Sequence, residues 1–167
     1  VVASGSTSAF RISNDATLAV SYTTSNGFSV PGTGTNSEQF GSGASSTGNY
    51  SVALGNGASA NVDSSVAIGS GATTTVSNSI AIGRNSGGGQ NSVSVGNNTS
   101  VTGGANVVIG YNAAEETGQS VAIGNAAQTS GGIAIGYNAS SNTSSVNRSI
   151  AIGNAAISTG TSTTVLG

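Results

Sequence analysis

Few side chains in this 167-residue sequence can do chemistry, and their types narrow the options. There are three arginines, five carboxylates, no lysine, no histidine and no cysteine. Without His or Cys, the chain cannot form a Ser-His triad, a thiol nucleophile or a zinc site with soft ligands. Without Lys, it cannot form a Schiff base or a P-loop phosphate site. We therefore expect no enzyme and no cofactor.

Glu115 and Glu116 form the only adjacent pair of carboxylates. Neighbouring residues on a strand point to opposite faces, so the pair makes a poor acid–base dyad, and we expect a solvated turn there. A polysaccharide hydrolase on a β-solenoid, the enzyme alternative, needs paired carboxyl groups about 5–9 Å apart, which the chain hardly supplies. Calcium-binding solenoids carry Asp in every turn, whereas this chain has two Asp, so no metal site is predicted.

Candidate ligand contacts come from a different set of residues. Arg84, Tyr111 and Tyr137 each follow a glycine directly, and they would share one exposed column if the surrounding segments stack in register. Asn142 and Arg148 lie in or at the end of an insertion in the repeat, and insertions in solenoids often map to the binding face. We select these five residues as candidate contacts.

The charge balance and hydropathy limit the partners. Three arginines in a chain of net charge −2 cannot hold a nucleic-acid backbone by counterion release. No apolar run approaches the roughly 18 residues of a membrane-spanning helix. We expect neither a nucleic-acid partner nor direct insertion of this segment into a membrane.

A short motif of the type Ser-Val-Ala-Ile-Gly recurs along most of the chain and must position these side chains. Its recurrence is close to regular, with two shorter intervals and one longer interval, and a small residue stands three positions after nearly every closing glycine. The motif occupies 37–41 in a degenerate form, then 51–55, 65–69, 79–83, 92–96, 106–110, 120–124, 132–136, 149–153 and 163–167.

This period predicts an all-β parallel solenoid of about ten 14-residue coils, a rod of roughly 45 Å at the usual strand spacing. Alternation places the two branched residues of each motif on one face, which we expect to be the core, with the alanine between them facing outward. On this assignment Ile123→Asp would bury a charge and abolish folding. The outward alanines would form a close-packing face, and we expect an obligate oligomer of unspecified chain number.

The glycines are predicted to have a structural role. The residue that ends each strand needs a backbone conformation with positive φ, which only glycine adopts cheaply. The predicted structural glycines are Gly55, Gly69, Gly83, Gly96, Gly110, Gly124, Gly136 and Gly153.

Residues 1–36 differ from the repeats at 37–167 and are predicted as a separate unit. Alternating apolar residues on either side of Asn14-Asp15 predict a β-hairpin, Phe28 begins a third short strand, and 31–34 form a linker. Such a unit can cap the first coil of a solenoid or dock it to a larger structure. Because the chain starts at Val1 and stops at a repeat boundary, we expect it to be a processed product or part of a longer protein.

The motifs at 78–83 and 148–153 resemble the tandem Asn-Ser-Val-Ala-Ile-Gly repeat of YadA-like heads in trimeric autotransporter adhesins. The resemblance covers residues 37–167. It implies a left-handed parallel β-roll, an intertwined homotrimer, and a head that attaches to a host surface protein or glycan from the bacterial cell surface. Phage tail and capsid fibres also use such repeats, so a virion fibre for host-cell attachment is the alternative.

Overall fold

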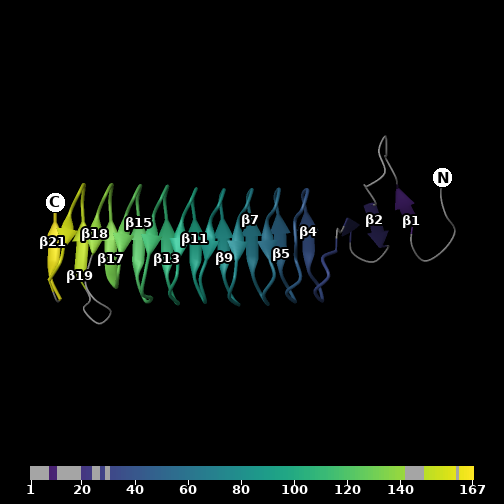
Figure 1. Cartoon of the computed structure of the whole chain (residues 1–167), viewed down its shortest axis with the longest axis horizontal. Helices are drawn as coiled ribbons and strands as arrows, with labels where there is room; N and C mark the ends of the chain where they lie inside the picture. The colour runs from purple at the N-terminus through teal and green to yellow at the C-terminus, as the bar shows by residue number, and fades with distance from the viewer. Residues whose placement is uncertain (1–7, 11–19, 24–26, 29–30, 142–148, 161) are drawn as a thin grey trace.

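Short strands connected by tight corners wind the chain into an elongated parallel β-solenoid of about nine turns (Figure 1). The structure is a computed structural model that describes residues 8–10, 20–23, 27–28, 31–141, 149–160 and 162–167. Successive coils stack along the long axis of the rod, and each coil contributes one strand to a long sheet and one to a shorter sheet. The predicted all-β solenoid with ~14-residue coils is confirmed.

The repeated motif forms one continuous ten-stranded parallel sheet. The register pairs equivalent motif positions in every coil, including the coils where the interval between motifs is irregular. Its strands are β4 (Glu38–Phe40), β5 (Val52–Leu54), β7 (Val66–Ile68), β9 (Ile80–Ile82), β11 (Val93–Val95), β13 (Val107–Ile109), β15 (Val121–Ile123), β17 (Gly132–Ile135), β19 (Ser149–Ile152) and β21 (Thr164–Leu166).

The second half of each coil adds a two-residue strand on another side of the rod. These strands form two parallel sheets, which meet between β10 and β12. The first sheet contains β6 (Ser59–Ala60), β8 (Thr73–Thr74) and β10 (Gly87–Gly88). The second contains β12 (Ser100–Val101), β14 (Ala114–Glu115), β16 (Gln128–Thr129), β18 (Ser140–Ser141) and β20 (Ile157–Ser158).

The core of the solenoid is narrow and consists mainly of small side chains. In the repeated motif, alanines such as Ala53, Ala81 and Ala122 are fully buried, whereas the flanking Val and Ile are only half-buried or exposed. The assignment of Val and Ile to the core is therefore wrong: Ala points inward and the branched residues point outward. A coil of this perimeter encloses too little space for two branched side chains per strand, because protein interiors are close-packed.

Serine hydroxyls in the core are satisfied by the backbone of their own coil. The hydroxyls of Ser51, Ser65 and Ser79 each donate to the carbonyl three positions earlier, at 2.6–2.7 Å. These serines precede the repeated strands and are buried. The bonds hold the corner before each strand in place and leave no unsatisfied hydroxyl at these positions.

The glycines that end the repeated strands have φ between 127° and 147° for Gly55 through Gly153. A side chain at Gly69, for example, would overlap the backbone carbonyl of Gly83 in the next coil. Two positions later, a second residue adopts left-handed φ, and this place is occupied by Gly57, Asn85 and their equivalents. Glycine at the first position is therefore required by both φ and coil stacking.

One corner of the coil contains every change in repeat length. The two shorter intervals, which end at Gly96 and Gly136, lose residues from the corner that leads from the second strand into the next motif, at 89–91 and 130–131. The longer interval, which ends at Gly153, gains residues in the same part of the repeat, where 142–148 lie outside the described residues. Strands on both sides of these intervals keep their register. The other corners are constrained by the stacking of neighbouring coils.

The polypeptide before the solenoid contains a small antiparallel sheet. Strand β1 (Ser8–Phe10) pairs with β2 (Val20–Thr23), which pairs with β3 (Gly27–Phe28). The predicted hairpin requires a pairing of this kind, and its Asn14-Asp15 turn lies outside the described residues. Residues 31–36 contact the first coil through hydrogen bonds from the amides of Thr33 and Gly34 to the Ser46 carbonyl. The division at residue 37 stays a prediction.

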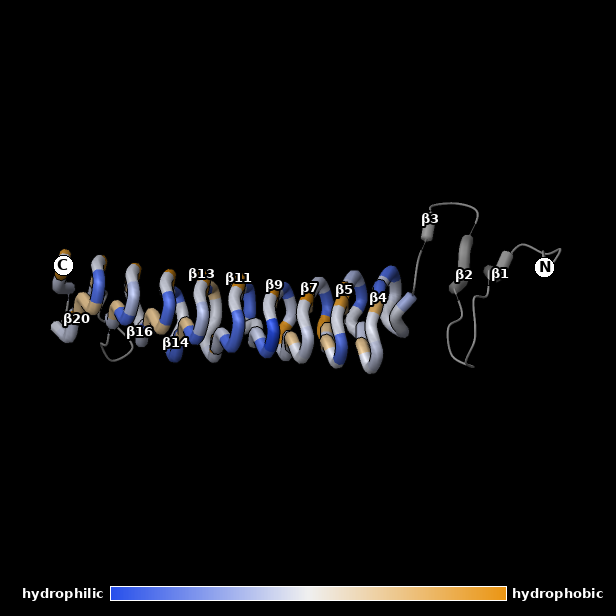
Figure 2. The backbone as a smooth tube through the Cα atoms, turned by 90° about the horizontal axis from the view of Figure 1, so that it is seen from above, coloured by the Kyte–Doolittle hydropathy of each residue, from blue (hydrophilic) through white to orange (hydrophobic). Residues whose placement is uncertain are grey.

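Backbone colouring by hydropathy shows the regularity of the winding. Figure 2 shows apolar segments recurring at the same place in successive coils, for example at β5, β7 and β9. Parallel pairing with equal register aligns each type of residue into a row along the rod. Every row presents its side chains at the spacing of adjacent strands, about 4.8 Å.

Candidate functional site

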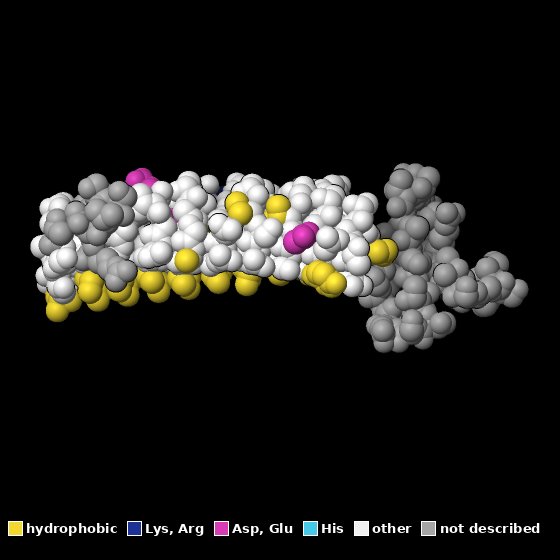
Figure 3. All heavy atoms as spheres, turned by 90° about the horizontal axis from the view of Figure 1, so that it is seen from below, with side chains coloured by type: hydrophobic (Ala, Val, Ile, Leu, Met, Phe, Trp, Pro, Cys, Tyr) yellow, Lys and Arg dark blue, Asp and Glu magenta, His cyan; other side chains and the backbone are white. Residues whose placement is uncertain are grey.

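An apolar surface follows the repeated strands on the outside of the rod. Figure 3 shows hydrophobic side chains gathered in a row along one edge of the solenoid. We call this row the outer stripe. It consists of the outward residues of strands β5 to β19: Val52, Leu54, Val66, Ile68, Ile80, Ile82, Val93, Val95, Val107, Ile109, Val121, Ile123, Ile133, Ile135, Ile150 and Ile152.

The outer stripe is hollowed toward its C-terminal half. A groove of about 440 Å³ is lined there by Val107, Val121, Ile133 and Ile150, among others. Gly132, the first residue of β17, also borders this groove. The motif that contains β17 follows the shortest interval between motifs. A continuous apolar row of this length on one molecule is typical of an interaction surface. The alanines that the sequence suggested as a close-packing face are buried, so the row that lies on the outside is that of Val and Ile.

The predicted column of turn residues exists as a stack of backbone hydrogen bonds. In this stack, a carbonyl in one coil accepts from the amide two positions beyond the closing glycine of the next coil, at 2.7–3.0 Å; the acceptors include Arg84, Asn97, Tyr111, Asn125 and Tyr137. Tyr111 and Tyr137 are 53% and 57% exposed, and Arg84 is exposed too. We call the row the turn ladder, and it consists of Arg84, Asn97, Tyr111, Asn125, Tyr137 and Asn154.

The other two candidate contacts are not placed. Asn142 and Arg148 lie outside the described residues. Contact between the five selected residues and a ligand stays a prediction.

Glu115 is not in a solvated turn but inside the solenoid, with 1% of its surface exposed. Its carboxylate accepts hydrogen bonds from the backbone amides of Gly103 and Gly118 and, at 2.7 Å, from the Asn106 side-chain amide. The expectation of a solvated turn is wrong for Glu115, because three donors converge on its carboxylate. Glu116 points outward and is exposed, as the alternation of strand faces predicts.

Asn106 extends this buried network into the neighbouring coil. It replaces the usual serine of its row, and its Oδ1 accepts from the Ser120 amide at 2.9 Å. Sequence reasoning missed Asn106. The available signal was a large amide at a position otherwise held by serine, in the same coil as a carboxylate. The network holds a carboxylate among fixed donors and offers no second carboxylate for acid–base chemistry.

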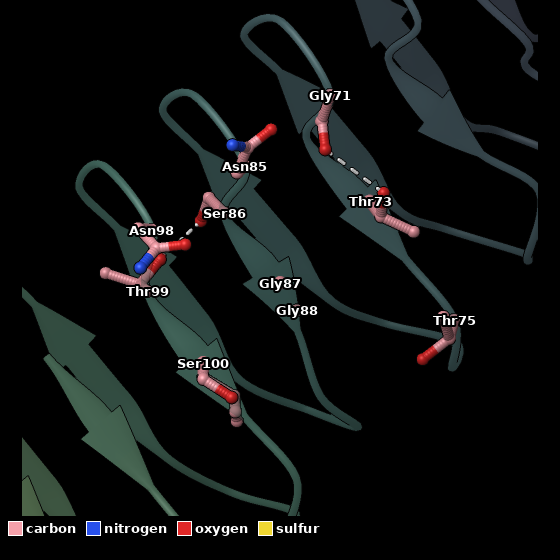
Figure 4. Close-up of a pocket in the computed structure, with 11 residues that line it drawn as sticks. Gly71, Thr73, Thr75, Asn85, Ser86, Gly87, Gly88, Asn98, Thr99 and Ser100 are labelled. Carbon is pink, nitrogen blue, oxygen red and sulfur yellow. Dashed lines mark hydrogen bonds between the residues drawn. The ribbon is translucent and has the colours of Figure 1, made fainter. Parts of the chain in front are cut away.

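A polar groove of about 450 Å³ lies where the two sheets of short strands meet. We call it the glycine groove, because Gly87 leaves the outer side of β10 without a side chain between β8 and β12 (Figure 4). Gly88 points into the core, whereas a side chain at Gly87 would meet only the Thr99 carbonyl, 3.6 Å away. Asn85 and Asn98 border the groove from the corner next to the turn ladder.

Beneath this groove, the core is closed by hydroxyl groups. The Ser86 hydroxyl contacts the Thr99 hydroxyl at 2.7 Å, and the Ser94 hydroxyl donates to Thr99 Oγ1 at 2.7 Å. All three residues are buried. The groove therefore has a floor whose polar groups already have partners, and its rim carries the groups that face solvent.

The described residues contain no group of three or more side chains that could hold a metal ion. Within the same part of the chain, the structure has no helix of the length and hydropathy that crossing a bilayer requires.

Comparison with known families identifies the repeat. Residues 40–58, 63–86 and 147–167 match the YadA head domain repeat. The matched segments lie at both ends of one uninterrupted ten-stranded sheet, so the structure continues the same winding through the residues between them. A search of curated proteins found no match to the chain. The YadA head is a non-catalytic adhesin module, and heads of this family are trimeric and exposed on the bacterial outer membrane.

Proposed function

Because the chain carries YadA head domain repeats, we propose that it forms a trimeric head that attaches a bacterial cell to a host surface. The trimer would be an intertwined left-handed β-roll, with residues 1–36 as its cap or docking unit. The host partner would be a surface protein or a glycan.

The outer stripe is the observation that carries this proposal. Its paired Val and Ile side chains run the length of the repeated sheet and lack a partner within the described chain. Burying such a row yields about 25 cal/mol for each Å² of apolar surface. A narrow core of alanine and serine provides little of this stabilisation within one chain. Association of three stripes around a common axis would bury the row in every copy.

The first test is the solution mass of residues 1–167 by light scattering, with circular dichroism on the same sample. We expect a β-rich particle of about 47 kDa, three times the 15.8 kDa of one chain. A well-folded particle of 15.8 kDa would contradict the trimer.

Attachment needs a separate experiment. Beads coated with the purified protein are expected to adhere to epithelial monolayers more than beads coated with an unrelated protein. A protein of trimeric mass whose beads do not adhere would contradict the attachment function while leaving the assembly intact. Adherence to bacterial cells but not to epithelial cells would instead favour the virion-fibre alternative.

A further inference from the structure

We propose that the glycine groove binds a neutral oligosaccharide and that the chain of sugars continues along the turn ladder toward Tyr111. This inference rests on the proposed attachment function and gives its ligand a chemical class. The groove lies on the sheets of short strands and shares no lining residue with the outer stripe.

The lining of the groove matches a ligand with many hydroxyl groups and no charge. It consists of Thr, Ser, Asn and Gly residues and one valine, and none of the lining residues is charged. Within the described residues, the Asn85 side-chain amide and the hydroxyls of Thr75 and Ser100 have no hydrogen-bond partner. Hydroxyls and amides placed in this way exchange hydrogen bonds with sugar hydroxyls without neutralising a charge.

The turn ladder extends the groove with flat side chains at a regular distance. Asn98 borders the groove and donates to the Asn112 amide oxygen at 2.8 Å, directly beside Tyr111. Tyr111 and Tyr137 are two coils apart, which is about 10 Å at the usual strand spacing. Two sugar units of an extended chain cover a similar length, so every second ring can stack on a phenol, with one sugar between them.

Asn125 stands between the two tyrosines in the ladder and is exposed. Its amide can accept and donate a hydrogen bond to the sugar that spans the interval. The arrangement of phenol, amide and phenol along one edge therefore continues the chemistry of the groove. Tyr111, Asn125 and Tyr137 carry no charge, so an acidic ligand would gain nothing from this part of the ladder. Arg84, the cationic member of the turn ladder, directly precedes Asn85 and is the one group there that would attract an acidic ligand.

Gly87→Gln tests the groove with little risk to the fold. The backbone at Gly87 is not left-handed, the space beyond its Cα is open, and Gln128 occupies the equivalent outward position in another coil. The glutamine side chain would occupy the groove. Ala114→Gln places the same side chain at an outward position of β14, outside the groove, and is the matched control.

The experiment measures binding of the full chain to a printed array of neutral, sialylated and sulfated oligosaccharides. We expect neutral chains to bind, Gly87→Gln to weaken them at least about tenfold through lost hydrogen bonds, and Ala114→Gln to leave them unchanged. Tyr111→Ala should weaken longer chains several-fold and leave disaccharides unaffected.

Absence of binding to neutral oligosaccharides, or equal binding by Gly87→Gln and the parent chain, would overturn the proposal. Binding restricted to sialylated or sulfated chains would overturn it too. Bead adherence that survives Gly87→Gln would contradict the groove alone, because the attachment function would still hold. If beads coated with the parent chain fail to adhere, as do beads coated with either variant, the attachment function itself is contradicted.

Discussion

Glu115 occupies a position where other coils place Ala60, Thr74 or Thr129 in the core. Its carboxylate is accommodated because two backbone amides and one side-chain amide point at it. Burial of a carboxylate without such donors would be strongly unfavourable. At this position a hydrogen-bonded carboxylate therefore takes the place of the small side chains found in other coils.

Glu115→Ala should lower the free energy of unfolding by about 3 kcal/mol, since it leaves buried donors unpaired. Urea denaturation at matched protein concentration measures the change. Glu116→Ala is the control, because Glu116 is exposed and its carboxylate accepts from the Ser130 hydroxyl at the surface. Equal midpoints for the two variants would show that the buried network contributes nothing.

Among the described residues, three alanines adopt left-handed φ, and Ala126 at 55° is one of them. In other coils the equivalent position is held by Gly71, Asn98 or Asn138, residues that tolerate this conformation. Ala126→Asn should therefore raise stability by about 1 kcal/mol. Thermal melting detects the shift, and Ala114→Asn, on a regular strand, should show no such gain.

At the scale of the coil, the closing glycines decide whether neighbouring coils can stack. Gly110→Ala would drive its Cβ into the Gly124 carbonyl, in addition to the strain of a φ of 140°. We expect loss of the cooperative melting transition followed by circular dichroism. Gly57→Ala is the matched control: its φ is 64° and no atom lies within 4 Å of the added Cβ, so the cost is about 1–2 kcal/mol. Similar melting of both variants would argue against stacking as the constraint.

The spacing of these glycines is enough to predict the length of the coils and their register, but it does not locate the second strands. Irregular intervals such as the one from Gly124 to Gly136 do not disturb this prediction, because pairing depends on the motif and not on the corner between motifs. Alternation in the motif shows which residues share a face but not which face is inside. That choice depends on the width of the coil, which is why alternation alone misplaces Ile123 and Ala122.

The candidate site is predictable only where it follows from register. Tyr111 and Tyr137 align because equivalent positions stack, and the repeat alone implies this. The burial of Glu115 depends on donors from Gly103 and Gly118, which converge only in the folded coil. The glycine groove depends on the absence of a side chain at Gly87, and sequence spacing does not show whether neighbouring residues fill such a gap.

At the scale of the whole molecule, the proposed assembly depends on the outer stripe. Ile123 lies on this stripe, so Ile123→Asp should prevent association and leave a particle of about 15.8 kDa by light scattering. Ile157→Asp is the control, because Ile157 is 59% exposed on β20, away from the stripe. A trimeric mass for Ile123→Asp would show that the stripe is not the contact between chains.

The corner that contains every change in repeat length has a practical consequence. A foreign peptide loop grafted at 130–131 would leave the stacked strands on either side in register, because the shortened corner there already does so. Several grafts in successive coils would be displayed about 4.8 Å apart along a stiff rod. The molecule can thus serve as a scaffold that presents epitopes in a line, each separated from the next by the spacing of adjacent strands.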